Sequence, residues 1–461
     1  MLKKLLTYPV ISLSIFIAFL LIFSAFSYWK IYSNTLGKIS HNYERVGDWN
    51  NYQIHPVKKP YEKISNQNLL QWDADIYKCI SERLYEEEDK CYGRVRGAFF
   101  PLFPLIWKLF YLNPIAISIL NYILFSFSIF ILFKLYFKEK LEHNKLLYAV
   151  LLSFPAAVFY FIPYSEALFL FTTCLAICAD AKKKKALYFI AALLLAMVRP
   201  ATVFVMLAIS FTELIKCFVV KDIKTGFSSM FLKLIPFFIG YLVVYIIQYI
   251  SSGNPFLFWE ARKFWVPDLV TEFKISDWST EGFGMSVFAL VIVIPLSMYL
   301  FFKKMNKIRI QEGRFFMDIR NYWSMVSIFY LLGIFLFTML TSNGNLHSFS
   351  RFVLGSPFFF ILILDSLKNR EKQTWVKYFI SFIILVVGVA VFLNKVEYGG
   401  DRFQFAYLGL YLLMLFITYI IIKPNLSLKI EFLIGLILII ASLIWNSYLF
   451  NMFLSNAWVY T

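Results

Sequence analysis

The sequence predicts an all-α polytopic membrane protein whose 461 residues form a single membrane domain over 1–461. Hydrophobic residues make up 60% of the chain and charged residues only 16%, against about 25% charged residues in a typical soluble domain. The apolar residues are gathered in runs near the length of about 20 residues that a helix needs to cross a bilayer. Inside lipid each run must be helical, because no water is present to pair with its backbone.

The apolar runs predict about 11–14 membrane helices, several of them shorter than 20 residues. The first run, 8–28, follows Met1-Leu2-Lys3-Lys4 and is too long for a signal-peptide core, so we expect an uncleaved anchor. The other expected spans are 114–137, 146–163, 166–181, 186–198, 200–217, 230–251, 284–302, 322–341, 352–367, 378–394, 404–422 and 430–450.

The distribution of basic residues predicts which ends of these spans face the cytoplasm. With a cytoplasmic N-terminus, Lys and Arg cluster in the inner connections, for example Lys182 to Lys185, and are sparse in the short outer ones. Two outer segments are long: 29–98, which carries a candidate catalytic acid, and the Trp-rich 252–283. Between them, 99–112 is apolar but too short and Pro-broken to span, so we expect it at the outer interface or re-entering among the helices.

The same distribution of charge bears on partners. The net charge of +17 comes from 45 basic and 28 acidic residues. Because the basic residues mark inner connections, we expect membrane lipids as partners and no nucleic acid. Cys79 and Cys91 share the first outer loop and either form a disulfide there or stay reduced. Cys174 and Cys178 have no metal-ligand spacing, and the sequence predicts neither a metal site nor a cofactor.

The first outer loop contains Trp72-Asp73-Ala74-Asp75. Carboxylates at i and i+2 point in different directions from a helix, so they do not form one paired site. Spacing alone favours a solvated acidic loop over the alternative, in which one carboxylate is a general base near the membrane surface.

Three further polar groups fall at predicted outer ends. Pro163-Tyr164-Ser165-Glu166 opens a span, where Glu166 either caps a helix or takes part in a site. Arg199 lies in a short outer connection, and an arginine so near membrane depth suggests a function or a buried partner. The last group is His347-Ser348-Phe349-Ser350-Arg351. A transporter more typically places its polar groups at the midplane, whereas gathering at the outer face suits chemistry on a lipid-linked substrate.

Taken together, these motifs resemble the PIG-V family, the GPI mannosyltransferase 2 type of GT-C membrane glycosyltransferase. The resemblance covers about residues 70 to 360 and departs from the family at Gln71, where an arginine is common. Its elements are Trp72-Asp73-Ala74, Ala98-Phe99-Phe100-Pro101-Leu102-Phe103-Pro104, Ser153-Phe154-Pro155-Ala156-Ala157-Val158-Phe159, Tyr164-Ser165-Glu166-Ala167-Leu168-Phe169, Arg199 and Ser350-Arg351.

The resemblance implies a GT-C fold and inverting transfer of a sugar, mannose in the family, from a polyprenyl- or dolichyl-phosphate carrier to a glycolipid, glycan or protein. Asp73 would be the base, with Asp75 as the alternative and Glu166 as a further catalytic acid. The other residues implied in substrate binding are Trp72, Arg96, Tyr164, Ser165, Arg199, His347 and Arg351. Composition and compact loops favour a prokaryotic plasma membrane over the endoplasmic reticulum membrane. A lipid or polysaccharide transporter or flippase and a non-catalytic assembly factor remain the alternatives.

Overall fold

The computed structural model describes residues 42–48, 51–57, 64–86, 93–137, 144–265, 285–341, 349–368, 406–423, 426–454 and 456. The expected spans 8–28 and 378–394 lie outside the described residues, as do Cys91 and His347. Within the predicted first outer loop, strands β1 (Asn42–Asp48) and β2 (Asn51–Val57) pair antiparallel, with Asp48 opposite Asn51. This hairpin departs from the all-α prediction; the rest of the described chain is helical or irregular.

Six helices of the described residues are long and apolar enough to cross a membrane, which confirms a multi-pass membrane character. They are α5 (Pro114–Phe137), α9 (Thr202–Val220), α10 (Ile223–Ser252), the continuous rod α12–η5–α13 (Met285–Phe288, Ala289–Val293, Ile294–Gln311), α14 (Ile319–Thr341) and α19 (Leu428–Leu454). Shorter apolar helices are α8 (Lys185–Ala196), α16 (Pro357–Lys368) and α18 (Ala406–Ile422). Helix α7 (Glu166–Ala181) and α5 coincide with expected spans.

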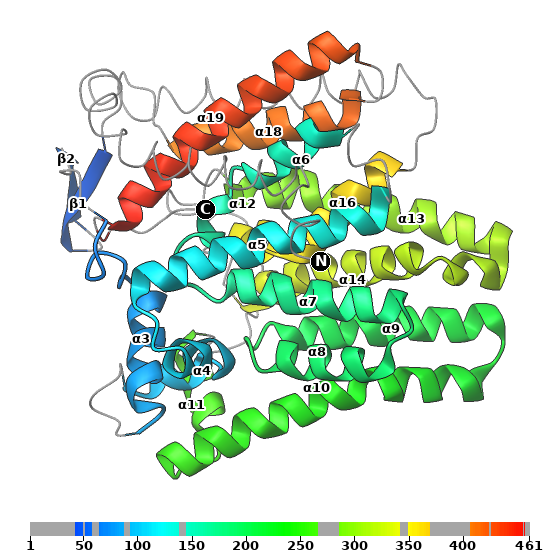
Figure 1. Ribbon diagram of the computed structural model, residues 1–461, viewed down its shortest axis with the longest axis horizontal. Helices are drawn as coiled ribbons and strands as arrows, with labels where there is room; N and C mark the ends of the chain where they lie inside the picture. The colour runs from blue at the N-terminus through cyan, green and yellow to red at the C-terminus, as the bar shows by residue number, and fades with distance from the viewer. Residues whose placement is uncertain are drawn as a thin grey trace, which may run out of the picture.

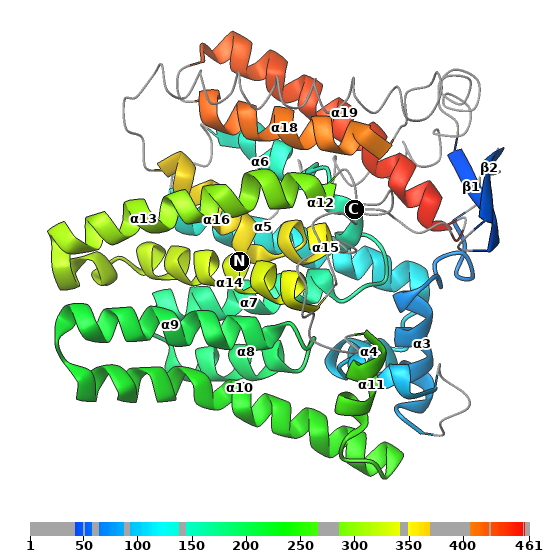
Figure 2. The same cartoon turned by 180° about the vertical axis from the view of Figure 1, so that it is seen from behind.

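The long helices run in one general direction and stack in layers (Figures 1 and 2). Helix α8 packs on α7 and α10, α9 packs on α10 and α14, and α14 packs on α13 and α16. Helices α18 and α19 pack together and cover α6 (Lys145–Leu152) on the opposite side from α10. Phenylalanines fill the interior: Phe154 lies 5.3 Å from Phe359 and 5.2 Å from Phe416 between ring centroids.

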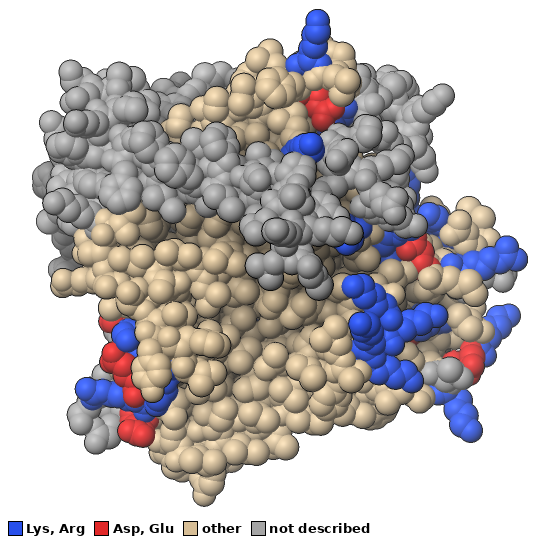
Figure 3. All heavy atoms as spheres, viewed as in Figure 1, with Lys and Arg blue, Asp and Glu red and all other residues tan. Residues whose placement is uncertain are grey.

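The two ends of the stack differ. At one end, called here the outer end, lie α3 (Asp73–Arg83), α4 (Leu102–Leu109) and α11 (Leu257–Trp265) (Figure 1). The opposite, inner end carries the exposed Lys182–Lys185 turn between α7 and α8, where basic side chains gather (Figure 3). This arrangement agrees with the sidedness that the basic clusters predict.

Two expected spans are interrupted rather than continuous. In the run 146–163 the α-helix is α6, which ends at Leu152. The chain then continues to Tyr164 as an irregular, almost wholly buried segment that contains one helical turn, η4 (Ala157–Tyr160). Pro155 explains the break, because the residue before a proline is driven from helical geometry. The run 352–367 is likewise split into α15 (Phe349–Leu354) and α16. Gly355 at that break approaches the Arg351 carbonyl too closely for any side chain.

The irregular segment 153–165 depends on two distant asparagines. Asn446 of α19 donates from Nδ2 to the Phe154 carbonyl (2.9 Å) and accepts from the Val158 amide at Oδ1 (2.9 Å). Asn121 of α5 donates to the carbonyls of Ile162 (2.7 Å) and Tyr164 (2.9 Å). Non-helical backbone at membrane depth persists only where protein partners satisfy its polar groups. These side chains therefore hold the chain that leads into Glu166.

Replacing Asn446 with leucine should destabilise the protein, because the buried Val158 amide and Phe154 carbonyl each lose a partner. We expect a loss of about 2 kcal/mol or more, seen as a lower Tm in detergent. Ser297→Ala is the matched control, because the Ser297 hydroxyl donates one turn back within the continuous α12–η5–α13 rod, to the Val293 carbonyl. An equal loss of Tm in both variants would refute the bridging role of Asn446.

Candidate functional site

Asp73 is brought to the protein body by α3, of which it is the first residue. Helix α3 is anchored by Tyr77, whose ring packs edge-on against Phe99 and Phe103 at 5.1 and 4.9 Å between centroids. The Tyr77 hydroxyl donates to Ser165 Oγ at 2.8 Å, just before α7. Burial raises the pKa of Tyr77, so its hydroxyl stays protonated and keeps this donor. The anchor fixes the start of α3 beside the start of α7.

Trp72, which precedes Asp73, has a backbone φ of 54° and ψ of −125°. Glycine adopts a positive φ readily, whereas a bulky side chain there is strained by about 1–3 kcal/mol. Trp72 is 41% exposed as a residue, so much of its surface is not covered by packing. Strain of this kind is characteristically held at functional positions.

Glu166 opens α7, and its side chain is fully buried. Its Oε1 accepts from Arg351 Nε at 2.5 Å and from Arg199 Nη1 at 3.0 Å. Its Oε2 is also buried and makes no hydrogen bond within the described residues. Helix capping alone would not recruit two arginines, so Glu166 is the central counter-ion of a charged site.

Arg351 of α15 joins the site to the outer loop. While its Nε binds Glu166, its Nη2 lies 2.7 Å from Asp73 Oδ2. The guanidinium also lies over the Tyr164 ring, 4.4 Å from the centroid, a favourable cation–π distance. Arg199, between α8 and α9, lies 5.3 Å from the Phe352 ring centroid. Four separate segments thus supply one chain of charges: Asp73, Arg351, Glu166 and Arg199.

The two carboxylates and two guanidiniums balance in charge, but their exposures differ. The side chains of Asp73, Arg351 and Arg199 are 16%, 10% and 11% exposed, and that of Glu166 is 0% exposed. The accessible part of the site is therefore formed by Asp73 and the arginines, with Glu166 beneath them. Guanidiniums in this setting are suited to binding a phosphate, with which they pair bidentately.

The other predicted site residues have varied places. Tyr164 contacts Arg351, and Ser165 contacts Tyr77 of α3. Trp72 directly precedes α3, and Asp75 lies in its first turn, two residues after Asp73. Arg96 is buried and donates to the Tyr85 carbonyl at 3.1 Å and to the Gly93 carbonyl, contacts that hold the end of the outer loop. Sequence reasoning missed Tyr77, for which no motif stood out.

The cysteines agree with the outer placement of this loop. Cys79 is disulfide-bonded, whereas Cys174, Cys178 and Cys217 are free. Disulfides persist in oxidising, extracytoplasmic compartments. In the part of the chain that the structure describes, no group of three His, Cys, Asp or Glu side chains has the geometry to hold a metal ion.

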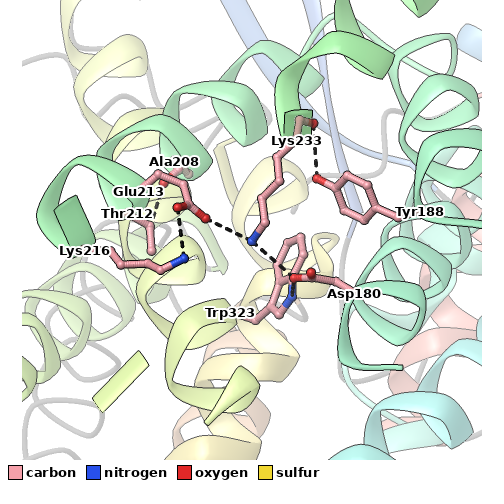
Figure 4. Close-up of polar contacts among 8 residues, drawn as sticks. All are labelled: Asp180, Tyr188, Ala208, Thr212, Glu213, Lys216, Lys233 and Trp323. Atoms are coloured by element: carbon pink, nitrogen blue, oxygen red, sulfur yellow. Dashed lines mark hydrogen bonds and ion pairs between the residues drawn. The ribbon is translucent and has the colours of Figure 1, made fainter. Parts of the chain in front are cut away.

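A second charged network lies toward the inner end (Figure 4). Glu213 of α9 is fully buried between Lys233 Nζ of α10 (3.0 Å) and Lys216 Nζ (3.3 Å). Lys233 also lies 3.5 Å from Asp180 Oδ2 of α7, which accepts from Trp323 Nε1 of α14 at 3.0 Å. The network ties four helices together with matched charges, which suits a packing role.

A third buried pair joins Lys304 of α13 to Asp365 of α16 at 2.8 Å, and Ser324 of α14 donates to the same carboxylate. Sequence reasoning missed both inner networks, although a signal existed: Glu213 and Asp365 fall inside expected spans, and charges inside spans are costly enough to require partners. Lys216 and Lys304 belong to helices α9 and α13.

Comparisons with known proteins add no relative: no protein-family model, no curated protein and no solved structure matches the chain. The resemblance to the PIG-V family therefore rests on the motifs alone.

The unequal burial of the two carboxylates predicts unequal effects on stability. Glu166→Gln should lower the free energy of unfolding by about 3 kcal/mol, because it leaves two guanidiniums without their buried counter-charge. Asp73→Asn should cost about 1 kcal/mol, because its pair with Arg351 is partly solvated. Thermal unfolding of both purified variants in one detergent checks the order; a larger loss for Asp73→Asn would contradict it.

Proposed function

We propose that the chain is a GT-C membrane glycosyltransferase. It transfers a sugar, mannose by its resemblance to the PIG-V family, from a polyprenyl- or dolichyl-phosphate carrier to a glycolipid, glycan or protein acceptor at the outer face. The observation that carries this proposal is the convergence of Asp73, Arg351, Glu166 and Arg199 at the outer end. It unites a partly exposed carboxylate with two guanidiniums, the groups that transfer from a lipid phosphate needs.

Each group has a role in the proposed reaction. The acceptor oxygen attacks the anomeric carbon of the donor sugar, from the face opposite the phosphate, so that the configuration inverts. The carbon–oxygen bond to the phosphate breaks, and its electron pair stays on the phosphate oxygen. Asp73 takes the proton of the acceptor hydroxyl. The arginines stabilise the negative charge that grows on the departing lipid phosphate.

Glu166 supports these arginines in the proposed site. Two guanidiniums held close together repel each other, and the buried carboxylate between them offsets that repulsion at 2.5 and 3.0 Å. The ion pairs also fix the orientation of each guanidinium before substrate arrives, so the arginines need not reorient during the reaction. Glu166 is on this account a positioning residue.

A specific observation favours a second candidate, a lipid or polysaccharide transporter or flippase. The interrupted segments α6–η4 and α15–α16 lie next to the charged cluster, since Arg351 belongs to α15 and its guanidinium lies 5.9 Å from the Phe159 ring centroid in η4. Discontinuous helices of this kind frequently form transporter binding sites. The enzyme is preferred because the carboxylate of the outer loop serves chemistry and has no evident task in transport.

Transfer activity distinguishes the two candidates. Purified protein in nanodiscs is given labelled polyprenyl-phosphate mannose and a mixed lipid and glycan acceptor extract. Asp73→Asn should lower the rate by about 100-fold or more, the usual contribution of a general base. Glu82→Gln, on the exposed side of the same helix and paired with Lys78 at 3.0 Å, should keep the full rate.

Two outcomes would overturn this assignment. Loss of transfer in Asp75→Asn with a normal rate in Asp73→Asn would move the base to Asp75. Movement of intact labelled donor across proteoliposome membranes by the wild-type protein, without sugar transfer, would establish the transporter instead.

A further inference from the structure

Arg351 contacts both Asp73 and Glu166, and its contact with Asp73 bears on how Asp73 could act as a base. A general base must be able to reach the acceptor hydroxyl, yet the Asp73 carboxylate is held against Arg351, with Oδ2 at 2.7 Å from Nη2. The same Nη2 is a donor that a lipid phosphate would use. Base and substrate therefore compete for one guanidinium.

We propose that the Asp73 carboxylate occupies the place of the donor phosphate on Arg351, and that donor binding displaces Asp73 and so releases it to act as the base. This inference rests on the proposed function and adds an order to it: the lipid-phosphate donor binds before the acceptor can be deprotonated.

Burial decides which carboxylate is exchanged. Glu166 is fully buried and holds both arginines through Oε1, so its removal would leave two buried guanidiniums without a counter-charge. Asp73 is 16% exposed, its carboxylate pairs with Arg351, and it comes from the outer loop rather than from a membrane helix. A phosphate arriving from the outer face reaches Asp73 first and leaves the Glu166 pairs intact.

Charge gives the exchange its direction. The four side chains are balanced without substrate, and a phosphodiester adds one negative charge. The phosphate offers Arg351 a bidentate partner, whereas Asp73 offers Nη2 a single contact. Repulsion between the phosphate and Asp73 then favours movement of the carboxylate away from the arginine.

The backbone on each side of α3 is compatible with such a movement. Trp72 and Leu84, which flank the helix, have φ values of 54° each, a strained region for residues with side chains. Release of the Asp73 contact allows the first of these residues to relax. Tyr77, bonded to Ser165 one turn further along, keeps the helix attached while its first turn adjusts.

The test is a binding measurement that involves no sugar transfer. A short-chain polyprenyl monophosphate is titrated by calorimetry into full-length wild type, Asp73→Asn and Glu82→Gln in the same detergent. Removing the competing carboxylate should tighten binding roughly tenfold, whereas Glu82→Gln, an equal loss of charge on the same helix, should leave the affinity unchanged. Asp73→Glu, which restores a competing carboxylate, should bind like wild type.

The outcomes separate the two proposals. Equal or weaker binding by Asp73→Asn refutes the exchange while leaving a lipid-phosphate donor in place. A gain of the same size in Glu82→Gln also refutes it, because the effect would then be one of general charge. No binding by wild type or Asp73→Asn rejects the donor class and with it both proposals. Asp73→Ala gives the same comparison if Asp73→Asn does not fold.

Discussion

The sharing of Glu166 Oε1 by Arg351 and Arg199 is the interaction on which the outer end depends. An unpaired guanidinium near membrane depth would be costly, and so would an unpaired carboxylate with no solvent exposure. Together they form a stable unit that joins α7, α15 and the connection between α8 and α9. Asp73 then attaches the outer loop to that unit through its ion pair with Nη2 of Arg351. Helix packing and site geometry are thus set by the same charges.

The irregular segment 153–165 helps to place Glu166 in this cluster. A continuous helix through 146–163 would present a different face at its outer end, whereas the Pro155 break leads the chain through buried, non-helical backbone into Ser165 and Glu166. Asn446 and Asn121 satisfy that backbone from two other helices. The inner networks around Glu213 and Asp365 stabilise the opposite end by pairing each buried carboxylate with lysine. The polar contacts of the interior therefore hold the helices at both ends.

Much of this organisation could be predicted from the sequence. Expected spans 114–137 and 166–181 coincide with α5 and α7, because long apolar runs with clear ends admit one interpretation. The sidedness of the basic clusters also predicts that Asp73, Glu166, Arg199 and Arg351 lie at the same, outer end. The breaks at Pro155 and Gly355 were missed, since hydropathy does not show that distant side chains will satisfy an opened backbone. The contacts of Arg96 with backbone carbonyls and the hydroxyl bond of Tyr77 are tertiary, and no local pattern encodes them.

On this account Arg199 and Arg351 form a phosphate-binding site, and the Asp73 carboxylate occupies the phosphate position on Arg351 until the donor binds. The most direct test is a cryo-electron microscopy structure of the protein in nanodiscs with a hydrolysis-resistant phosphonate analogue of a polyprenyl-phosphate sugar. The account predicts that the phosphonate contacts Arg351 and Arg199, that Arg351 keeps Glu166, and that the Asp73 carboxylate has left Arg351. The carboxylate then faces the position of the acceptor hydroxyl, on the side of the anomeric carbon opposite the phosphonate. A phosphonate bound elsewhere, with the Asp73–Arg351 pair intact, would contradict it.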